Sequence, residues 1–332
     1  MKNTVTTIYT RADDLPEMEY RNFFHSRSLF ALLEQTPRQQ PYMAVVTDGG
    51  GRVLGHLLAV VRHRRPLLSP CLCAHCRIWG EGEYVADLSE TGDGEYTVTE
   101  LFREMLVSLM SRLQVRVMYV EISNLSGKMF GYKLLREAGF FPVHWMGIHN
   151  SLHSMPPAER LGRKMRKRIE RAYEKGVVTA EVEGEEELGA FCALLRSHNR
   201  FKLKRYIPDC NFFRGLMQTE HARLFVTRYK GRVVGCCACA YSEGDAYLWY
   251  FAFLRKSFVM VRPDVMTIWH AIDNAYSRGY SHIHFMDVGL PFSKNPFREF
   301  ILRFGGKPVS TYRWFRFSAR WLNTVMSWRY KW

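Results

Sequence analysis

The sequence predicts a duplicated α/β fold with a mixed sheet in each half. The chain has 332 residues, which is enough for two domains of ordinary size. A hairpin-like segment occurs twice, at residues 42–61 and 222–241, with nearly identical centres, GRVLG and GRVVG. Each is followed by the same order of helix, strand, short helix and aromatic strand. We therefore expect one α/β domain at residues 1–153 and a second at residues 154–332.

The elements of the first half follow from side-chain spacing and turn residues. Residues 42–61 place β-branched segments on both sides of a glycine-rich turn, which is typical of a hairpin. A strand at residues 115–122, a short helix at 131–140 and an aromatic strand at 142–148 complete this half. The helix before them is indicated by apolar residues at helical spacing, namely Val98, Leu101, Met105, Leu109 and Leu113.

The second half repeats this order. After the hairpin at residues 222–241, Pro263 is well placed for a first helical turn and Gly279 for the end of that helix. A strand at 280–288, a short helix at 298–307 and an aromatic strand at 308–317 follow. The apolar positions of the long helix are Val265, Ile268, Trp269, Ile272 and Tyr276.

Composition and charge restrict the class of protein. Hydrophobic residues make up 47% and charged residues 24%, which excludes a disordered chain, and the apolar runs are too short for a membrane span. The N-terminus lacks the apolar core of a signal peptide, so we expect a cytoplasmic protein. A net charge of +15 predicts a polyanionic partner, either RNA, a phosphorylated ligand or an anionic membrane surface.

The eight cysteines are too few for a disulfide scaffold in a chain of this length. Most of them lie in two short runs that we expect to be strands or loops, which favours reduced thiols. The two runs contain Cys71, Cys73 and Cys76, and Cys236, Cys237 and Cys239.

A basic helix is predicted between the two halves, at residues 157–176. Residues 154–176 contain eight Lys or Arg and three Glu. One stripe of this helix is apolar and the basic side chains cover the rest. The stripe consists of Leu161, Met165, Ile169 and Ala172.

Several motifs together resemble a known family. They are the basic helix KMRKRIERAYEKGV (164–177), LWYFAF (248–253), RPDVMTIWHAIDNAYSRGY (262–280), HFMDVG (284–289) and FILRFGGKPV (300–309). The chain resembles the Fem family of peptidoglycan interpeptide-bridge transferases and the wider FemAB-like acyltransferases, which have tandem GNAT-like domains. The resemblance implies transfer of an acyl or aminoacyl group to an amine, with acyl-CoA or aminoacyl-tRNA as donor and no permanently bound cofactor. The acceptor it implies is phosphorylated or related to the cell envelope.

The sequence departs from that family in three places. Ile301 stands where many members have a lysine near the terminal Phe-Gly motif. The long helical arm of some Fem transferases is missing. The loop LRKSFVMVRPD (254–264) lacks the glycines with which GNAT enzymes bring their backbone close to a pyrophosphate.

The candidate catalytic residues are Asp287 and Tyr250. Asp287 ends a hydrophobic strand, where α/β sheets present side chains to ligands, although an aspartate that caps the following turn would look the same. We expect it to orient or deprotonate the attacking amine. Trp249 and Tyr250 should point to opposite faces of their strand, one toward the site and the other into the core.

The candidate binding residues are cations and aromatic side chains. Arg255, Lys256 and Arg262 precede the helix at Pro263 and form the best phosphate site, unless they are simply a solvated basic loop. A second basic and aromatic cluster suits a nucleotide, a sugar phosphate or RNA. It contains Arg196, Arg200, Phe201, Lys202, Lys204, Arg205 and Tyr206. Our predicted substrate contacts are Arg205, Tyr206, Trp249 and Arg303.

We expect neither a metal site nor a covalent intermediate. His282 and His284 share one face of a strand, but no carboxylate or cysteine accompanies them at ligand spacing. The CLCAHC run is a single short segment with no second group of ligands. No nucleophile elbow is present, and we expect no DNA partner.

The C-terminal tail, residues 318–332, has two interpretations. If it is helical, one side carries Trp321, Val325, Trp328 and Trp332, as in an interfacial membrane anchor at the inner face of the membrane. The same tryptophans would also suit a terminal helix that closes the core of the second domain.

Three functions stay open at this stage. The first is a FemAB-like N-acyltransferase acting on a phosphorylated or envelope-related acceptor. The second is a peptidoglycan-bridge type of transferase that depends on aminoacyl-tRNA, which the net charge and the basic helix favour. The third is a catalytically inactive peripheral module that binds an anionic lipid or envelope precursor.

Overall fold

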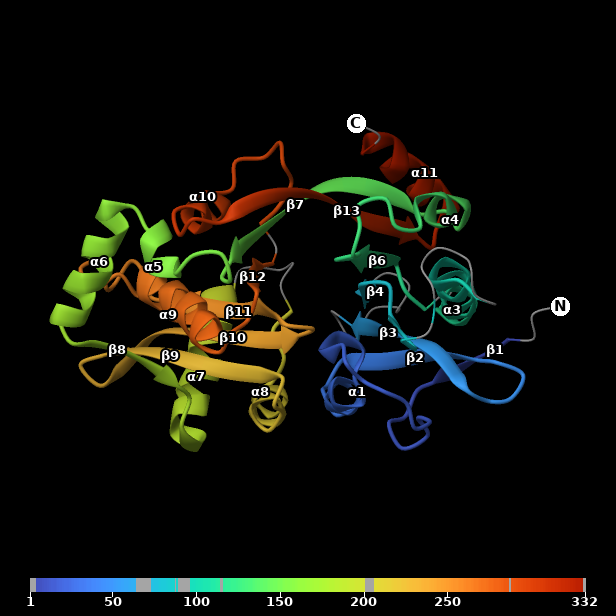
Figure 1. Ribbon diagram of the computed structural model, residues 1–332, viewed down its shortest axis with the longest axis horizontal. Helices are drawn as coiled ribbons and strands as arrows, with labels where there is room; N and C mark the ends of the chain where they lie inside the picture. The colour runs from blue at the N-terminus through green and yellow to red at the C-terminus, as the bar shows by residue number, and fades with distance from the viewer. Residues whose placement is uncertain are drawn as a thin grey trace. The chain divides into compact units, whose positions relative to one another are not determined.

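The computed structural model describes residues 4–63, 73–86, 88, 96–113, 116–200, 206–286 and 288–330. The chain divides into two compact units, Met1–Trp145 with Ser310–Trp332, and Met146–Val309. Helices cover a mixed sheet in each unit (Figure 1), so the predicted α/β fold is confirmed.

The first unit is a sheet with the strand order β1-β2-β3-β4-β6-β13. The two-residue strand β5 pairs with β3. The strands are β1 (Val5–Tyr9), β2 (Gln39–Thr47), β3 (Val53–His63), β4 (Ala74–Trp79), β5 (Glu83–Tyr84), β6 (Tyr119–Ser123) and β13 (Lys307–Phe317), which ends in this unit. The helices are η1 (Phe23–His25), α1 (Arg27–Glu34), α3 (Val98–Leu113), α4 (Tyr132–Glu137) and α11 (Arg320–Arg329).

Helix α3 supplies much of the core of the first unit. It begins with a reciprocal cap, in which the Thr97 hydroxyl accepts a hydrogen bond from the Glu100 N–H and the Glu100 carboxylate accepts one from the Thr97 N–H. Its predicted apolar stripe is buried against the sheet, with Trp314 of β13 in the same core. The buried members of the stripe are Leu101, Met105, Leu109 and Leu113.

The second unit has the strand order β7-β12-β11-β10-β9-β8. The strands are β7 (Phe141–Ser151), which begins in the first unit, β8 (Val177–Glu181), β9 (Ala222–Tyr229), β10 (Arg232–Ser242), β11 (Asp245–Phe253) and β12 (His282–Phe285). The helices are α5 (Pro157–Arg160), α6 (Arg163–Glu174), α7 (Gly184–Asn199), α8 (Cys210–Met217), α9 (Pro263–Ser277) and α10 (Pro296–Leu302).

Helices α7 and α9 cover opposite faces of this sheet. Cys236 and Cys237 are consecutive in β10, and consecutive residues of a strand face opposite sides. The Cys236 thiol contacts the carbonyl of Phe191 in α7, whereas the Cys237 thiol contacts the carbonyl of Thr267 in α9. The second unit is therefore a sheet between two helical layers.

The last strand of each repeat lies in the unit formed mainly by the other repeat. Residues 148–151 of β7 pair with residues 282–285 of β12, and residues 314–317 of β13 pair with residues 119–122 of β6. The boundary predicted between residues 153 and 154 follows the repeat in the sequence, whereas the compact units exchange their final strands. The tail at residues 318–332 consequently belongs to the first unit.

The expectation that all thiols are reduced is wrong for one pair. Cys192 of α7 and Cys210 of α8 form a disulfide. The two residues lie outside the cysteine-rich runs and are 18 residues apart in the sequence, but they face each other on neighbouring helices. Among the other described cysteines, Cys76, Cys236, Cys237 and Cys239 are buried thiols outside any disulfide, and Cys73 is also buried. Cys71 lies outside the described residues.

Candidate functional site

Strands β11 and β12 of the second unit stop pairing before β11 ends. Their parallel pairing runs from Asp245 and His282 to Leu248 and Phe285, whereas β11 continues to Phe253 beside β10. In the first unit the corresponding strands, β4 and β6, stay paired to their last residues. The Gly80 N–H even extends this ladder with a 2.7 Å hydrogen bond to the Ser123 carbonyl. Among the described strands, the sheet thus opens at the end of β11.

A β-bulge lies at this opening. Ala238 of β10 is opposite Tyr250, and Cys239 is opposite Leu248, so Trp249 is the extra residue. The rings of Trp249 and Tyr250 lie 5.1 Å apart, and both contact Phe212 of α8, at 5.8 and 6.3 Å. The prediction that Trp249 and Tyr250 face opposite sides is wrong, because the bulge interrupts the alternation of the strand.

The basic loop that follows β11 leads directly into α9. Its last residue, Arg262, has the left-handed backbone conformation, with φ 48° and ψ 57°. The buried carboxylate of Asp264 pairs with two of the three predicted phosphate ligands: Arg255 Nε lies 3.3 Å from Oδ2, and Arg262 Nε lies 3.7 Å from Oδ1. Lys256 is exposed and has no ion pair within the described part of the chain. The carboxylate of Asp264 therefore lies within ion-pair distance of two of the cations and partly neutralises them, although neither of its oxygens accepts a hydrogen bond from the described residues.

Residues 160–299 match the family model described as the GNAT acetyltransferase domain. This segment contains the strand opening, the bulge and the basic loop. It is a GNAT domain. No curated protein matches the sequence significantly.

Solved structures resemble nearly the whole chain. FemX has a TM-score of 0.60 and 11% identity, over 90% of this chain and 97% of FemX. The C-terminal domain of a putative lysylphosphatidylglycerol synthetase from Agrobacterium fabrum has a TM-score of 0.58 and 11% identity, over 93% of this chain and 91% of that domain. A tandem GNAT protein from the clavulanic acid biosynthesis pathway has a TM-score of 0.51 and 11% identity, over 89% and 88% of the two chains.

These likenesses establish the fold of the whole chain. At 11% identity the similar structures do not show the activity of this chain. They cover both repeats, whereas the family model covers only the second repeat. The predicted resemblance in fold to FemAB-like proteins with tandem GNAT-like domains is confirmed.

Five predicted residues of the GNAT domain lie outside the described residues. These are Asp287, Phe201, Lys202, Lys204 and Arg205. The loop that begins at Val288 is held in place by Asn295, whose side-chain amide donates to the Val288 carbonyl at 2.7 Å. Arg298 donates to the carbonyls of Leu290 and Ser293 at 2.7 and 2.6 Å. The chain after Asp287 is thus fixed by hydrogen bonds.

The remaining predicted substrate contacts differ in exposure. Tyr206 is partly buried, and Arg303 is exposed at the end of α10. Ile301, which stands where many members of the Fem family have a lysine, is fully buried in the core of the second unit. In this fold, position 301 points away from solvent and cannot present a charge to a substrate.

The Phe-Gly motif at Phe304 and Gly305, which follows the GNAT domain, packs against β7 and α5. The Asn150 side chain donates to the Phe304 carbonyl at 2.9 Å. Gly305 has a φ of +84°, and a Cβ atom at this position would lie 2.8 Å from the Arg160 Cβ. Glycine is required here by backbone conformation and close packing, so the motif supports the fold.

Sequence reasoning missed the partners of His282 and His284. The two histidines do share a face, and both contact one carboxylate, with Nδ1 of His282 3.0 Å and Nε2 of His284 2.9 Å from the oxygens of Asp245. His149 of β7 lies beside both, with ring centroids 5.3 and 5.7 Å away. The strand register brings these residues together, since Asp245 is opposite His282 and His284 is opposite His149.

The charges of this histidine cluster are coupled. Burial opposes ionisation of Asp245, but hydrogen bonds and charge from His284 and His282 outweigh it and lower the pKa of the carboxyl. Burial and the same two histidines lower the pKa of His149. No group of three or more His, Cys, Asp or Glu in the described ranges is arranged to hold a metal ion.

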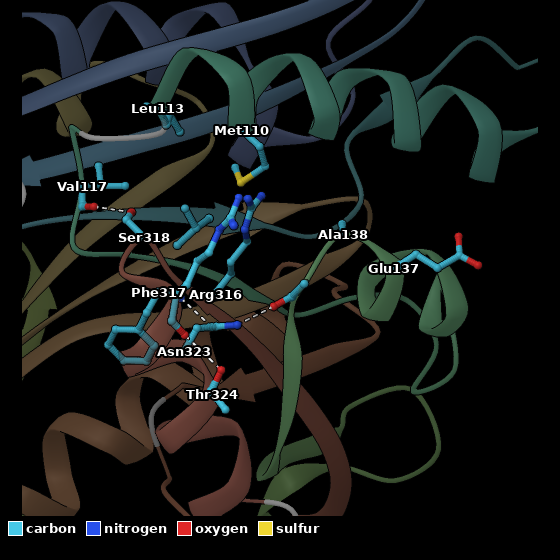
Figure 2. Close-up of a pocket in the computed structure, with 13 residues that line it drawn as sticks. Met110, Leu113, Val117, Glu137, Ala138, Arg316, Phe317, Ser318, Asn323 and Thr324 are labelled. Carbon is cyan, nitrogen blue, oxygen red and sulfur yellow. Dashed lines mark hydrogen bonds between the residues drawn. The ribbon is translucent and has the colours of Figure 1, made fainter.

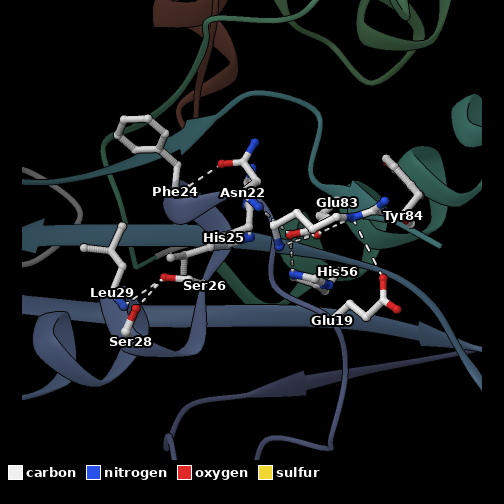
Figure 3. Close-up of polar contacts among 12 residues, drawn as sticks. Glu19, Asn22, Phe24, His25, Ser26, Ser28, Leu29, His56, Glu83 and Tyr84 are labelled. Atoms are coloured by element: carbon white, nitrogen blue, oxygen red, sulfur yellow. Dashed lines mark hydrogen bonds and ion pairs between the residues drawn. The ribbon is translucent and has the colours of Figure 1, made fainter. Parts of the chain in front are cut away.

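The first unit also contains a buried polar network that the sequence did not indicate (Figure 3). Glu83 accepts hydrogen bonds from the N–H groups of Arg21, at 2.6 Å, and Asn22, at 3.0 Å, and lies 3.6 Å from His56 Nε2. His25 Nδ1 accepts a hydrogen bond from the Leu58 N–H at 3.0 Å. Burial lowers the pKa of His25 to about 3 and that of His56 to about 4. These contacts attach the segment before α1 to the sheet.

The basic helix of the GNAT domain has its predicted arrangement. Its four-residue apolar stripe is buried. The cations exposed on its surface are Arg163, Lys164, Arg166, Lys167, Arg171 and Lys175. The helix packs against α9, and Lys175 Nζ donates to the Met260 carbonyl at 3.3 Å. The basic helix therefore adjoins the loop that carries Arg255, Lys256 and Arg262.

The tail does not close a hydrophobic core. Residues 320–329 form α11, none of whose residues is buried. Trp321 and Trp328 are 71% and 74% exposed. Trp332 lies outside the described residues. No helix in the described ranges is long and apolar enough to cross a membrane.

Proposed function

We propose that the protein is an N-acyltransferase whose chemistry takes place in the GNAT domain. It moves an acyl or aminoacyl group onto an amine of a phosphorylated or envelope-related acceptor. The parting of β11 and β12 after Leu248 and Phe285, beside a basic loop at the start of α9, carries this proposal. GNAT acetyltransferase domains use acyl-CoA as co-substrate, so acyl-CoA is the first candidate donor.

The proposed reaction is direct attack. The amine nitrogen attacks the thioester carbonyl, a C–N bond forms, the C–S bond breaks, and the thiolate leaves with a proton. Asp287 orients the amine and accepts its proton, and Tyr250 protonates the leaving thiolate. Tyr250 is a candidate because it lies at the bulge where the strands part and its ring is packed against Phe213, 5.2 Å away.

The donor phosphates are assigned to the loop before α9. Lys256 supplies an exposed ammonium group, while Arg255 and Arg262 lie within ion-pair distance of Asp264. The N-terminus of α9 adds its partial positive charge. Because this loop has no glycine, side chains rather than backbone N–H groups bind the phosphates.

The net charge of the chain and its similarity in fold to a named protein support the proposed acceptor. The net charge of +15 favours an anionic acceptor. One protein of similar fold is named as a putative lysylphosphatidylglycerol synthetase. This name refers to a phospholipid that carries an aminoacyl group. A phospholipid or envelope precursor is consistent with both observations, and the amine on it follows from the proposed N-acyl transfer.

Aminoacyl-tRNA is a second candidate donor, and the basic helix α6 favours it. Helix α6 and the residue just after it carry six exposed cations, one of which, Lys175, contacts the phosphate loop at Met260. This basic surface is larger than a binding site for the pyrophosphate of CoA requires. A basic surface of this size suits a nucleic acid backbone.

Hydrogen exchange measured by mass spectrometry separates the two donors. Saturating acetyl-CoA should protect residues 249–262 and leave the exposed face of α6 unchanged, whereas charged tRNA should also protect residues 163–175. Helix α3 of the first unit serves as the internal control. Absence of protection at residues 249–262 with either donor would contradict the proposed function.

A further inference from the structure

Helix α11 is attached to the first unit by polar contacts at one side. The Asn323 side chain donates to the Gly139 carbonyl at 3.0 Å and accepts from the Phe317 N–H at 2.9 Å. The Ser318 N–H donates to the Met118 carbonyl at 3.0 Å. These bonds hold the beginning of the helix in place although none of its side chains is buried.

The side of α11 that faces away from Asn323 and adjoins Thr324 presents large apolar side chains to solvent. Trp321, Val325 and Trp328 are 71%, 53% and 74% exposed, and their spacing of four and three residues puts them on one stripe. An exposed stripe with two tryptophans is unusual for a surface that contacts only water. Tryptophan is the side chain most typical of a membrane interface.

A pocket of about 630 Å³ adjoins α11 (Figure 2). Its apolar wall consists of Met110, Leu113, Val117 and Val120, and its polar wall includes Arg316, Arg320, Asn323 and Thr324. The pocket thus combines an apolar surface with two guanidinium groups, as a site for the phosphate end of an amphiphile requires.

Arg316 has no counter-ion within the residues that the structure describes. It is half-buried, and burial lowers the pKa of its guanidinium. Glu137 also lines the pocket, but Figure 2 shows its carboxylate turned away from Arg316. Taking a cation out of water without an anion is costly, which favours an external anion here.

The charge of the segment around α11 also favours an anionic partner. From Phe300 to Trp332 the sequence contains seven Lys or Arg and no Asp or Glu. Basic side chains next to exposed tryptophans are typical of surfaces that lie on anionic lipids. An acidic protein that bound this surface would not need the pocket beside α11, whereas a lipid would.

We propose that α11 and the adjoining pocket form a docking face for an anionic phospholipid membrane. Trp321, Val325 and Trp328 enter the interfacial region, and Arg316 and Arg320 bind a lipid phosphate. This face belongs to the first unit and is independent of the transfer reaction proposed for the GNAT domain.

Vesicle co-sedimentation with the full chain tests the proposal. Wild-type protein should bind phosphatidylcholine vesicles that contain phosphatidylglycerol and bind pure phosphatidylcholine vesicles much more weakly. Trp321→Ala with Trp328→Ala, which leaves the net charge unchanged, should weaken binding at least about tenfold, because it removes most of the inserted apolar area. Arg316→Gln should reduce the preference for phosphatidylglycerol. Met129→Ala, which removes another exposed apolar side chain of the same unit, should have no effect.

Two results would overturn the proposal. One is binding of the double tryptophan variant as tight as that of wild type, because binding would then follow from net charge alone. The other is a wild-type protein that does not bind vesicles but forms a dimer, which the tryptophan substitutions dissociate. The stripe would then be the contact with a second copy of the chain. Circular dichroism and thermal unfolding establish that each variant is folded.

Discussion

The rings of Trp249 and Tyr250 lie 5.1 Å apart and at an angle of 36°, although the two residues are consecutive in a strand. The bulge that places them together also marks the point where β11 loses β12 as a neighbour. Both rings contact α8, so the opening of the GNAT sheet is stiffened by aromatic packing.

Removal of the Tyr250 hydroxyl tests its catalytic role. Tyr250→Phe keeps the ring and its contact with Phe213, so the melting temperature should change by less than about 2 °C. Turnover should fall by about 100-fold, the usual value of a positioned general acid. Thiol release from acetyl-CoA with a panel of amines gives the rate. Tyr247→Phe is the matched control on the same strand, and equal rates for both variants would remove Tyr250 from the mechanism.

Loss of the Asp264 carboxylate should destabilise the GNAT domain. Asp264→Asn leaves Arg255 and Arg262 without their counter-ion, at a cost of about 1–2 kcal/mol because both arginines are partly exposed. Thermal unfolding followed by circular dichroism measures this cost. The control is Asp273→Asn on the same helix, because burial raises the pKa of Asp273 and folding therefore does not favour its charged form. Equal melting temperatures for the two variants would show that the Asp264 ion pairs contribute nothing.

The stability of the first unit should depend on pH. His25 and His56 have pKa values lowered by burial from 6.5 to about 3 and about 4, so the folded state keeps them neutral while the unfolded state binds protons. Stability is then complete above pH 6.5 and is lost as pH falls toward the folded pKa values, by about 1.4 kcal/mol per pH unit for each histidine.

Urea unfolding between about pH 7 and pH 5 measures this dependence. Tyrosine and tryptophan fluorescence follows the unfolding transition. His56→Gln, which cannot take up a proton, should reduce the slope by about 1.4 kcal/mol per pH unit. A free energy of unfolding that stays constant over this range would contradict the assignment of two neutral, buried histidines.

Restoring the lysine of related proteins at position 301 should not restore a binding group. Ile301→Lys places a charge in the core of the second unit, where Ile301 is fully buried, and should cost about 4 kcal/mol or more. The expected result is a chain that unfolds at much lower temperature or does not fold. Ile301→Leu is the conservative control. A stable Ile301→Lys protein with higher activity would show that position 301 reaches the substrate.

The sequence predicted the architecture well because the repeat and the apolar periodicity are local signals. The stripe of α6, with Met165, Ile169 and Ala172, is buried as predicted, and so is that of α3. The exchange of β7 and β13 between the units could not be predicted, because it depends on pairing between strands that are distant in the sequence. The spacing of side chains within one strand does not show which strand it pairs with.

The candidate site was predicted less completely. The sequence placed Arg255 and Arg262 before a helix, but their shared partner, Asp264, depends on the left-handed turn at Arg262. The clustering of Asp245, His149 and His284 depends on the register of three strands that are distant in the sequence. Both arrangements arise from tertiary packing, which side-chain spacing along one element does not encode.

Calorimetric titration with acetyl-CoA tests the central claim most directly. The GNAT domain should bind acetyl-CoA and free CoA with micromolar affinity, while ATP, the control for unspecific binding of polyanions, binds much more weakly. Lys256→Gln should weaken binding of both CoA ligands about fivefold, which corresponds to about 1 kcal/mol. Absence of binding, or ATP binding as tight as that of acetyl-CoA, would contradict the assignment of an acyl-CoA site to the loop before α9.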